Sequence, residues 1–462
     1  MRLESARSRA LGLLVSSIVA LTVLLPTEPP RAQTRPAQPN IVFVIVDDMG
    51  YGDLGCTGAP DLKTPAIDRI AREGVKLTDF YSNGPNCSPT RAGFISGRYQ
   101  QRVGIEMPLG AYAADSGRGL PVTPTSLPRL LKDRGYATAL IGKWHLGGQP
   151  RFHPNRHGFD EFWGFMSGWH DFYTSTRRGQ PDIFHNEELS SYTGYMTDEI
   201  STRARGFIES HAGHPFFVEV AYNAPHWPFQ PPDLSEEKRA RADLLHDGTR
   251  ADYVAMVERV DRGVGEILGT LDRLDLARNT LVIFTSDNGG EWLSRNAPFF
   301  HRKSTLWEGG IRVPALLRWP DRLPRGAVSD QVGITMDLTA SMLAAAGVTA
   351  PASYRPDGID LLPLLEKKRT IERTLFWRIA NDARNQRAVR RGHWKYLRDG
   401  IGGNDSVHEF LFDLAKDPGE RSDVTIAQAV LLPEFRKLLA DWEADVDSSR
   451  TRAGIEAVSG AH

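Results

Sequence analysis

Four short apolar runs, each followed by polar residues, constrain the fold of this chain more than any other feature. Strands that are buried on both faces have this pattern, because helices cover both sides of a parallel sheet. The runs are Ile41–Val46, Ala137–Ile141, Phe216–Val220 and Leu281–Phe284. They predict strands of one buried sheet.

Helical patterns occur between these runs. Thr64 followed by Pro65 indicates the start of a helix that ends near Gly74, since proline favours the first helical position and glycine the position after the last. The segments 126–133 and 252–274 also show helix signals, the second through apolar residues at helical spacing. Strands alternating with helices predict an α/β fold with a large mixed, mostly parallel sheet flanked by helices.

The pattern changes after about residue 363. Antiparallel strands and then a helix are predicted there, at Leu375–Trp377, Arg387–Leu397, Glu409–Leu414 and Pro433–Trp442. The length of 462 residues is enough for two domains. We therefore expect a catalytic domain over 39–365 and a smaller C-terminal α+β subdomain, an antiparallel sheet with a helix, over 366–450.

The first residues have the pattern of a secretory signal peptide. Arg2, Arg7 and Arg9 precede the apolar stretch Leu11–Leu25, and a proline-rich segment follows. An uncleaved anchor is the alternative, but the stretch is shorter than the roughly 20 residues that span a bilayer. We expect a signal peptide over 1–32, a periplasmic or secreted protein, and no stable membrane anchor.

Charge and cysteine content exclude several classes of protein. The 56 Lys and Arg residues nearly balance the 57 Asp and Glu residues, so neither nucleic acid nor an anionic membrane is favoured as a partner. The two cysteines, Cys56 and Cys87, cannot form a disulfide framework, although one disulfide is possible. Cys56 has the sequence context of a loop or small core residue.

Each of the four predicted strands leads into residues that can carry chemistry. These are Asp47 and Asp48 after the first run, Lys143 and His145 after the second, His226 after the third, and Asp287 and Asn288 after the fourth. In open α/β sheets, ligands bind at the carboxyl ends of the strands. All four sets are therefore expected to converge on one cleft.

The acidic residues at two of these ends suggest a metal site. The adjacent carboxylates of Asp47 and Asp48 repel one another and need a compensating cation, and Asp and Asn oxygens suit a hard ion such as Ca²⁺ or Mg²⁺. Either motif alone is better explained as a helix cap or a turn. The presence of both motifs favours the metal.

The segment Cys87-Ser-Pro-Thr-Arg91, followed by Ala92, is the most specific motif of the chain. With it, the chain resembles the arylsulfatase-like branch of the formylglycine-dependent sulfatases, in the alkaline phosphatase superfamily. The resemblance runs from about Pro39 to the end of the chain. It includes Gly50–Asp53, Thr64-Pro65, Gly142–Gly147 and Glu308–Gly310.

The resemblance implies both a modification and a ligand set. Cys87 would be oxidised to formylglycine (3-oxoalanine) by a formylglycine-generating enzyme acting as a maturation partner. The metal, usually Ca²⁺ with Mg²⁺ possible, would be bound by Asp47, Asp48, Asp287, Asn288 and an oxygen of the modified Cys87. Arg91 would steady the formylglycine. The other polar residues that match the family site are Lys143, His145, His226 and Lys303.

These residue types suit the hydrolysis of a sulfate ester. The metal, Lys143 and Lys303 would neutralise the anionic oxygens. One hydroxyl of hydrated formylglycine, deprotonated with help from Asp287, would attack sulfur while His226, assisted by Lys303, protonates the leaving alcohol. The second hydroxyl would then expel sulfate by re-forming the aldehyde, with His145 as base.

Two other functions are compatible with the sequence. One is a phosphonate or phosphodiester hydrolase of the same superfamily, and the other is an inactive relative that binds sulfated glycans. The substrate is expected to be a sulfated small molecule or glycan, and a 6-sulfated galactose-type sugar is our specific prediction. Aromatic residues in 159–173 either stack on that substrate or pack the loop: Trp163, Trp169, His170, Phe172 and Tyr173.

Overall fold

The computed structural model describes residues 38–110, 117–239, 247–380, 384–400 and 407–452. The predicted signal peptide lies outside these residues. Within the described part of the chain, no helix is both long and apolar enough to cross a bilayer.

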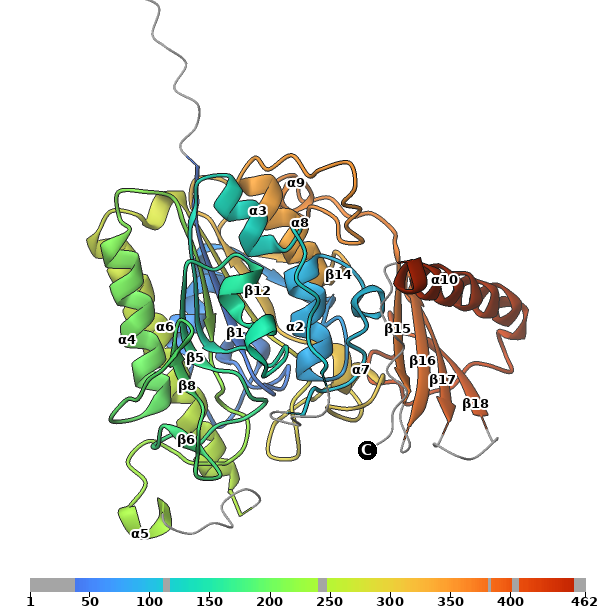
Figure 1. Cartoon of the computed structure of the whole chain (residues 1–462). Helices are drawn as coiled ribbons and strands as arrows, with labels where there is room; N and C mark the ends of the chain where they lie inside the picture. Colours follow the sequence, from blue (N-terminus) through green and yellow to red (C-terminus); the bar gives the residue numbers. More distant parts are fainter. Residues whose placement is uncertain (1–37, 111–116, 240–246, 381–383, 401–406, 453–462) are drawn as a thin grey trace, which may run out of the picture. The chain divides into compact units, whose positions relative to one another are not determined.

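A ten-stranded sheet forms the centre of the fold (Figure 1). Its five middle strands are parallel, in the order β11 (Thr280–Ser286), β1 (Asn40–Val46), β10 (Phe216–Ala221), β4 (Ala137–Lys143) and β5 (Glu161–Phe165). Beyond β11 lie β12 (Ala315–Arg318), β2 (Val75–Leu77) and β13 (Ala327–Ser329), and beyond β5 lie β8 (Ile183–His185) and β9 (Glu188–Leu189). The pairs β11–β12, β12–β2, β5–β8 and β8–β9 are antiparallel. The predicted mixed, mostly parallel sheet is confirmed, and the four apolar runs are four adjacent strands within it.

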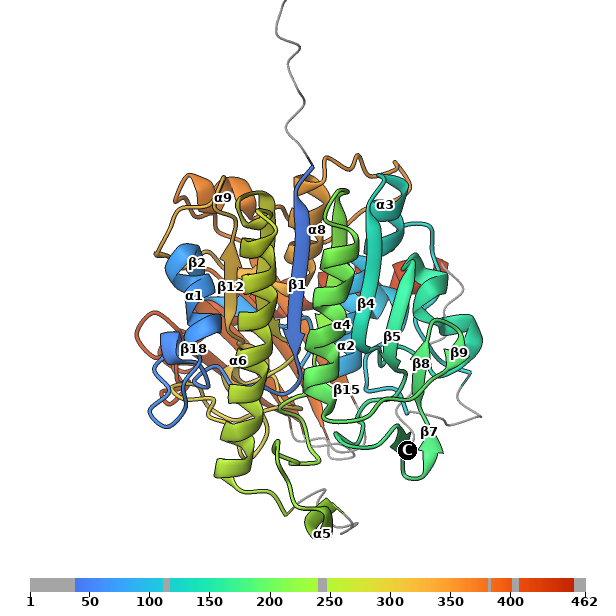
Figure 2. The same cartoon turned by 90° about the vertical axis from the view of Figure 1, so that its left-hand side faces the viewer.

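Helices cover both faces of this sheet (Figures 1 and 2). One face carries α1 (Pro65–Glu73), α4 (Met196–Ser210) and α6 (Arg250–Arg273), and the other carries α2 (Cys87–Ser96), α3 (Leu127–Asp133) and α8 (Thr335–Ala345). Alternate residues of β1 enter the two cores, with Phe43 packing on one side and Val44 on the other. This alternation explains why the strand sequence is apolar throughout. The shorter elements are β3 (Phe80–Tyr81), β6 (Thr176–Arg177), β7 (Gln180–Pro181), α5 (Glu236–Arg239), α7 (Glu308–Ile311), β14 (Gly333–Ile334) and α9 (Leu362–Glu366).

The C-terminal part of the chain forms a separate antiparallel sheet. Its strands lie in sequence order, β15 (Thr374–Ala380), β16 (Asn385–Arg391), β17 (Trp394–Gly400) and β18 (Val407–Asp413), and α10 (Leu432–Arg452) packs on it. The predicted run Arg387–Leu397 is a hairpin, with Gly392 in the left-handed conformation (φ 56°) at its turn. The helix continues well beyond the predicted end at Trp442.

One acidic residue lies inside a strand that the sequence marks as apolar. Glu219 is in the middle of β10, beside Phe43 of β1 and Leu140 of β4, and is 2% exposed. Its Oε2 atom has no hydrogen-bond partner among the described residues. Burial raises the pKa of Glu219 to about 8, although Arg91 acts to lower it. Glu219 is therefore protonated in the folded protein near neutral pH.

We expect Glu219→Gln to stabilise the protein at pH 8 but much less at pH 5. The pKa of Glu219 is higher in the folded state than its ordinary value of 4.5. The folded state therefore holds a proton that the unfolded chain releases, and stability is lost as the pH rises from about 4.5 towards 8. Glutamine does not titrate, so it removes this linkage. The unfolding free energy of the variant minus that of the wild type should therefore increase by up to about 4 kcal/mol from pH 5 to pH 8. Urea unfolding at both pH values measures it, and a difference independent of pH would contradict it.

Candidate active site

The carboxyl ends of the four central strands bring the predicted site residues together. Val46 lies level with Ser286 on β11, and Ala221 pairs with both Ile45 and Gly142. The residues that follow these positions therefore meet at one edge of the sheet. All the predicted site residues are buried except Lys303, which is partly buried with 10% side-chain exposure.

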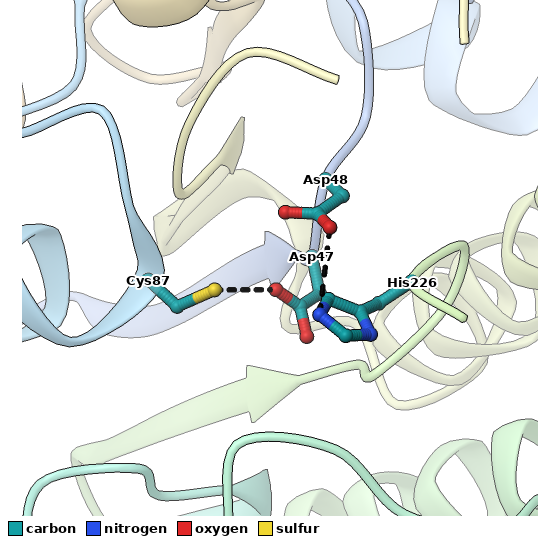
Figure 3. Close-up of side chains that lie close together, drawn as sticks. All are labelled: Asp47, Asp48, Cys87 and His226. Carbon is teal, nitrogen blue, oxygen red and sulfur yellow. Dashed lines mark hydrogen bonds and ion pairs between the residues drawn. The ribbon is translucent and has the colours of Figure 1, made fainter. Parts of the chain in front are cut away.

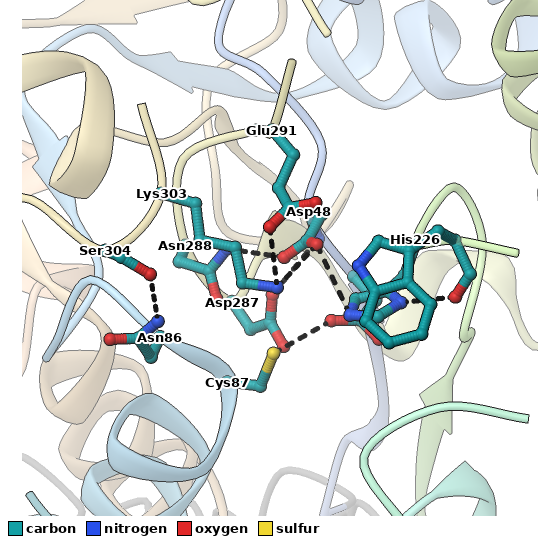
Figure 4. A network of polar contacts seen from close by, with 12 residues as sticks. Asp48, Asn86, Cys87, His226, Asp287, Asn288, Glu291, Lys303 and Ser304 are labelled. Atoms are coloured by element: carbon teal, nitrogen blue, oxygen red, sulfur yellow. Dashed lines mark hydrogen bonds and ion pairs between the residues drawn. The ribbon is translucent and has the colours of Figure 1, made fainter. Parts of the chain in front are cut away.

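Each carboxylate of the Asp47-Asp48 pair forms an ion pair with a lysine. Lys143 Nζ lies 2.5 Å from Asp47 Oδ2. Lys303 Nζ lies 2.6 Å from Asp48 Oδ2 (Figure 4). Burial acts to raise the pKa of Asp48, but Lys303 and His226 lower it below its ordinary value. Two cations and two carboxylates thus form a charge-balanced core of the site.

Cys87 opens α2 and faces the acidic pair. Its Sγ lies 3.2 Å from Asp47 Oδ1, and it belongs to a buried group with Asp47, Asp48 and His226 whose potential ligand atoms all lie within 4.8 Å of one another (Figure 3). Burial and the nearby Asp287 raise the pKa of the Cys87 thiol well above its ordinary value. The unmodified thiol is therefore uncharged near neutral pH and a poor nucleophile.

Asn288 supplies the test of whether a cation suits this group. Its Nδ2 donates to Asp48 Oδ1 at 2.7 Å, while its Oδ1 is buried and has no hydrogen-bond partner among the described residues. A buried amide oxygen without a donor, beside two carboxylates, is an arrangement that oxygen-preferring divalent cations satisfy. The donor set therefore fits a hard metal ion.

Asp287 and Arg91 form a second buried pair. The Arg91 guanidinium donates to Asp287 Oδ2 through Nε at 3.1 Å and Nη2 at 2.9 Å, and Nη1 donates to the carbonyl of Lys143. Asp287 Oδ1 accepts the backbone N–H of Asp48 at 3.3 Å. Burial and Asp47 raise the pKa of Asp287 to about 6, against the opposing effect of Arg91. Arg91 thus orients Asp287 and the strand end that carries Lys143.

The two histidines are uncharged near neutral pH. Burial and Lys143 lower the pKa of His145 well below its ordinary value. Burial and Lys303 lower the pKa of His226 to about 3, although Asp48 acts to raise it. His145 Nε2 lies 3.0 Å from the Leu109 carbonyl oxygen, and His226 Nε2 lies 3.5 Å from Asp48 Oδ2.

Sequence reasoning missed Glu291. Its carboxylate lies 3.8 Å from Lys303 Nζ, and burial and Asp48 raise its pKa (Figure 4). Its position directly after the predicted Asp287–Gly290 strand end is the signal that could have indicated it. Glu291 shares Lys303 with Asp48.

The predicted aromatic residues differ in burial. Trp163, which lies in β5, and His170 and Phe172, which lie in the loop after it, are fully buried, so these three pack in the protein interior. Trp169 and Tyr173 are only partly buried.

Comparison with known proteins agrees with this fold. The sulfatase family model matches residues 39–348, and the model described as N-sulphoglucosamine sulphohydrolase, C-terminal, matches residues 297–441. N-acetylgalactosamine-6-sulfatase of Sus scrofa is 35% identical over 87% of this chain and 85% of its own length. Steryl-sulfatase of Mus musculus is 32% identical over 96% of this chain and 87% of its own length. The crystal structure of Ps i-CgsB in complex with k-i-k-neocarrahexaose superposes with a TM-score of 0.79, at 31% identity, covering 88% of this chain and 92% of that one.

This chain therefore belongs to the sulfatase family and is an enzyme that hydrolyses sulfate esters. Membership implies a metal ion and a formylglycine made from cysteine. Cys87 is the cysteine of the buried acidic group, whereas Cys56 is partly exposed in a short 3₁₀ turn. Both are free thiols, so the single disulfide does not form.

Proposed function

We propose that this enzyme removes sulfate from a carbohydrate, using an oxygen nucleophile formed on oxidised Cys87. The observation that carries the proposal is the position of Cys87, 3.2 Å from Asp47 in a group of metal-binding side chains, with a lysine on each neighbouring carboxylate. The similarity to an N-acetylgalactosamine-6-sulfatase supports a 6-sulfated galactose-type sugar. An aryl sulfate is the simpler alternative substrate.

We further propose Ca²⁺ as the resident ion, with Mg²⁺ as the alternative. Asp47, Asp48, Asp287 and Asn288 would hold it, together with the modified Cys87. When bound, the ion supplies positive charge that neutralises sulfate oxygens and favours an ionised nucleophile. The oxygen-rich donor set supports a hard cation.

The chain's own residues divide the remaining tasks. Hydrated formylglycine supplies a hydroxyl nucleophile, and Asp287, which Arg91 orients, takes its proton. Lys143 and Lys303 bind the anionic oxygens of the ester.

His226 and His145 transfer protons when the alcohol leaves and when sulfate is expelled. His226 protonates the leaving alcohol, assisted by Lys303, because a bound sulfate ester adds negative charge beside His226 and raises its pKa. His145, which is neutral, serves as the base when sulfate is expelled.

We also propose the domain boundaries, the cellular location and the maturation partner of the chain. Residues 1–32 form a cleaved signal peptide, 39–365 the catalytic domain and 366–450 the C-terminal subdomain, in a periplasmic or secreted protein. A formylglycine-generating enzyme acts on Cys87 during maturation. The match of a C-terminal family model to residues 297–441 supports the C-terminal subdomain, although that match begins earlier than our boundary.

Assay of three esters of one leaving group tests the reaction class. We expect kcat/KM for the 4-nitrophenyl sulfate to be at least roughly 100-fold higher than kcat/KM for the phosphate and phosphonate esters. The reason is that the two lysines and the cation would bind the anionic oxygens of one sulfate group. The enzyme is produced with a formylglycine-generating enzyme, and mass spectrometry of the tryptic peptide Leu77–Arg91 establishes the aldehyde. Faster hydrolysis of the phosphonate would refute the proposal. Aldehyde present without hydrolysis of any ester would favour a glycan-binding relative.

A further inference from the structure

Two tryptophans lie directly beside the proposed catalytic histidines. Trp227 follows His226 in the chain, and its carbonyl oxygen lies 2.5 Å from His226 Nδ1. Trp169 follows Gly168, which packs so closely on His145 that a Cβ there would lie 2.5 Å from His145 Nε2. The two indole rings are in contact, with centroids 5.2 Å apart at 48°, and both are partly exposed. A continuous aromatic surface therefore starts at the reaction centre.

Two arginines extend this surface. Arg177 and Arg178 lie over the Trp169 ring, with guanidinium carbons 4.5 and 5.5 Å from its centroid. They belong to the tight hairpin β6–β7, where Arg178 (φ 49°) and Gly179 (φ 77°) both adopt positive φ, as a two-residue type I′ turn requires. Arg178 is exposed and forms no ion pair with any described residue.

Buried and partly buried hydrogen bonds hold this surface in place before any ligand binds. Gln230, which is 3% exposed, donates to Asp171 Oδ2 at 2.8 Å and accepts the backbone N–H of Phe172 at 2.8 Å. The Tyr173 hydroxyl donates to the Pro231 carbonyl at 2.6 Å. The Trp169 segment is thus joined to the Trp227 segment on the protein side, which lowers the entropy lost on binding.

We propose that Trp169, Trp227 and Arg178 form the subsite for the alcohol part of the substrate, and that this alcohol is a carbohydrate with a second anionic group. A sugar ring would pack on the tryptophans, and a carboxylate or a second sulfate would pair with Arg178. A guanidinium stacked on an aromatic ring keeps its N–H edge free for bidentate binding of such a group. The inference rests on the proposed function and adds the substrate class to it.

Three substrates separate the contributions of this subsite. They are 4-nitrophenyl sulfate, a disaccharide of uronic acid and 6-sulfated N-acetylgalactosamine, and the same disaccharide with its carboxylate reduced to an alcohol. We expect the wild-type enzyme to prefer the charged disaccharide to the reduced one by at least about 10-fold in kcat/KM. Arg178→Ala should lower kcat/KM for the charged disaccharide about 10- to 100-fold, chiefly through KM, as loss of a charged hydrogen bond does. Its activity on the other two substrates should stay within about twofold.

Control variants make the result specific. Arg178→Lys should restore part of the preference, because it keeps the charge without the planar guanidinium. Arg262→Ala, at an exposed arginine of α6 that pairs with Glu266, should change nothing. Trp169→Leu should lower kcat/KM for both disaccharides.

The outcomes distinguish this subsite from the proposed function. If the wild-type enzyme cleaves the aryl sulfate but has the same kcat/KM for the charged and the reduced disaccharide, the proposed subsite is wrong and the proposed function is unaffected. The same follows if Arg178→Ala affects all three substrates equally or none of them. Absence of hydrolysis of every sulfate ester, by enzyme that carries the aldehyde, overturns the proposed function and the subsite with it.

Discussion

Replacement of Cys87 by alanine is expected to lower kcat/KM for sulfate esters by at least about 10⁴-fold. Alanine cannot be converted to formylglycine, so the covalent route through an oxygen nucleophile is lost. Because Cys87 is a small side chain at the start of α2, the fold should be retained. Steady-state assays of purified enzyme measure the loss, and thermal unfolding tests the fold.

Cys56→Ala is the matched control. Cys56 is the other cysteine of the chain and lies in a short 3₁₀ turn, outside the buried acidic group. Its replacement should leave hydrolysis unchanged. If Cys87→Ala retained the activity of the wild-type enzyme, and contaminating sulfatase had been excluded, the proposed nucleophile would be wrong.

Replacement of Lys395 by methionine is expected to destabilise the protein by about 3–5 kcal/mol. Lys395 Nζ lies 2.9 Å from Glu308 and 2.7 Å from Glu420, and all three side chains are fully buried. Burial acts to raise the pKa of Glu308, but Lys395 and Arg312 lower it to about 2, so Glu308 is ionised. Without Lys395, Glu308 would keep its ion pair with Arg312, but Glu420 would lose its ion pair with Lys395, so the buried negative charge would be only partly compensated. Urea unfolding followed by tryptophan fluorescence measures the loss.

Lys416→Met provides the control for this charge network. Lys416 is 86% exposed and pairs with Asp413 at 3.1 Å, so its removal should change the unfolding free energy by no more than about 1 kcal/mol. Adding Glu420→Gln to Lys395→Met should recover part of the stability, since it removes one uncompensated carboxylate. Equal effects of the two lysine replacements would show that the buried network contributes nothing special.

The buried network also connects the C-terminal sheet to the loop that carries Lys303. Lys395 belongs to β17, whereas Glu308 starts α7, five residues after Lys303. The Trp307 indole extends the contact by donating to Asp399. We infer that the C-terminal sheet helps to position the loop that carries Lys303.

The fold was predictable where its signals are local. The apolar runs and helix signals of the central layers indicated β1, β4, β10 and β11 and the helices α1, α3 and α6, because periodicity and capping depend on neighbouring residues. The short outer strands, such as β2 and β9, carry too few residues for a pattern to be recognised. Glu219 was overlooked because a single buried glutamate in a strand resembles an exposed one in sequence.

By itself, the sequence determined which residue types stand at the ends of the strands, and it marked Cys87 by the residues around it. The tertiary structure decided the pairings: Lys303 with Asp48, which are 255 residues apart, and Lys143 with Asp47. It also brought Trp169 against Trp227, and Lys395 against Glu308. Local motifs depend on residues that are adjacent in the sequence. These contacts depend instead on strand order and register, which arise only when distant segments pack together.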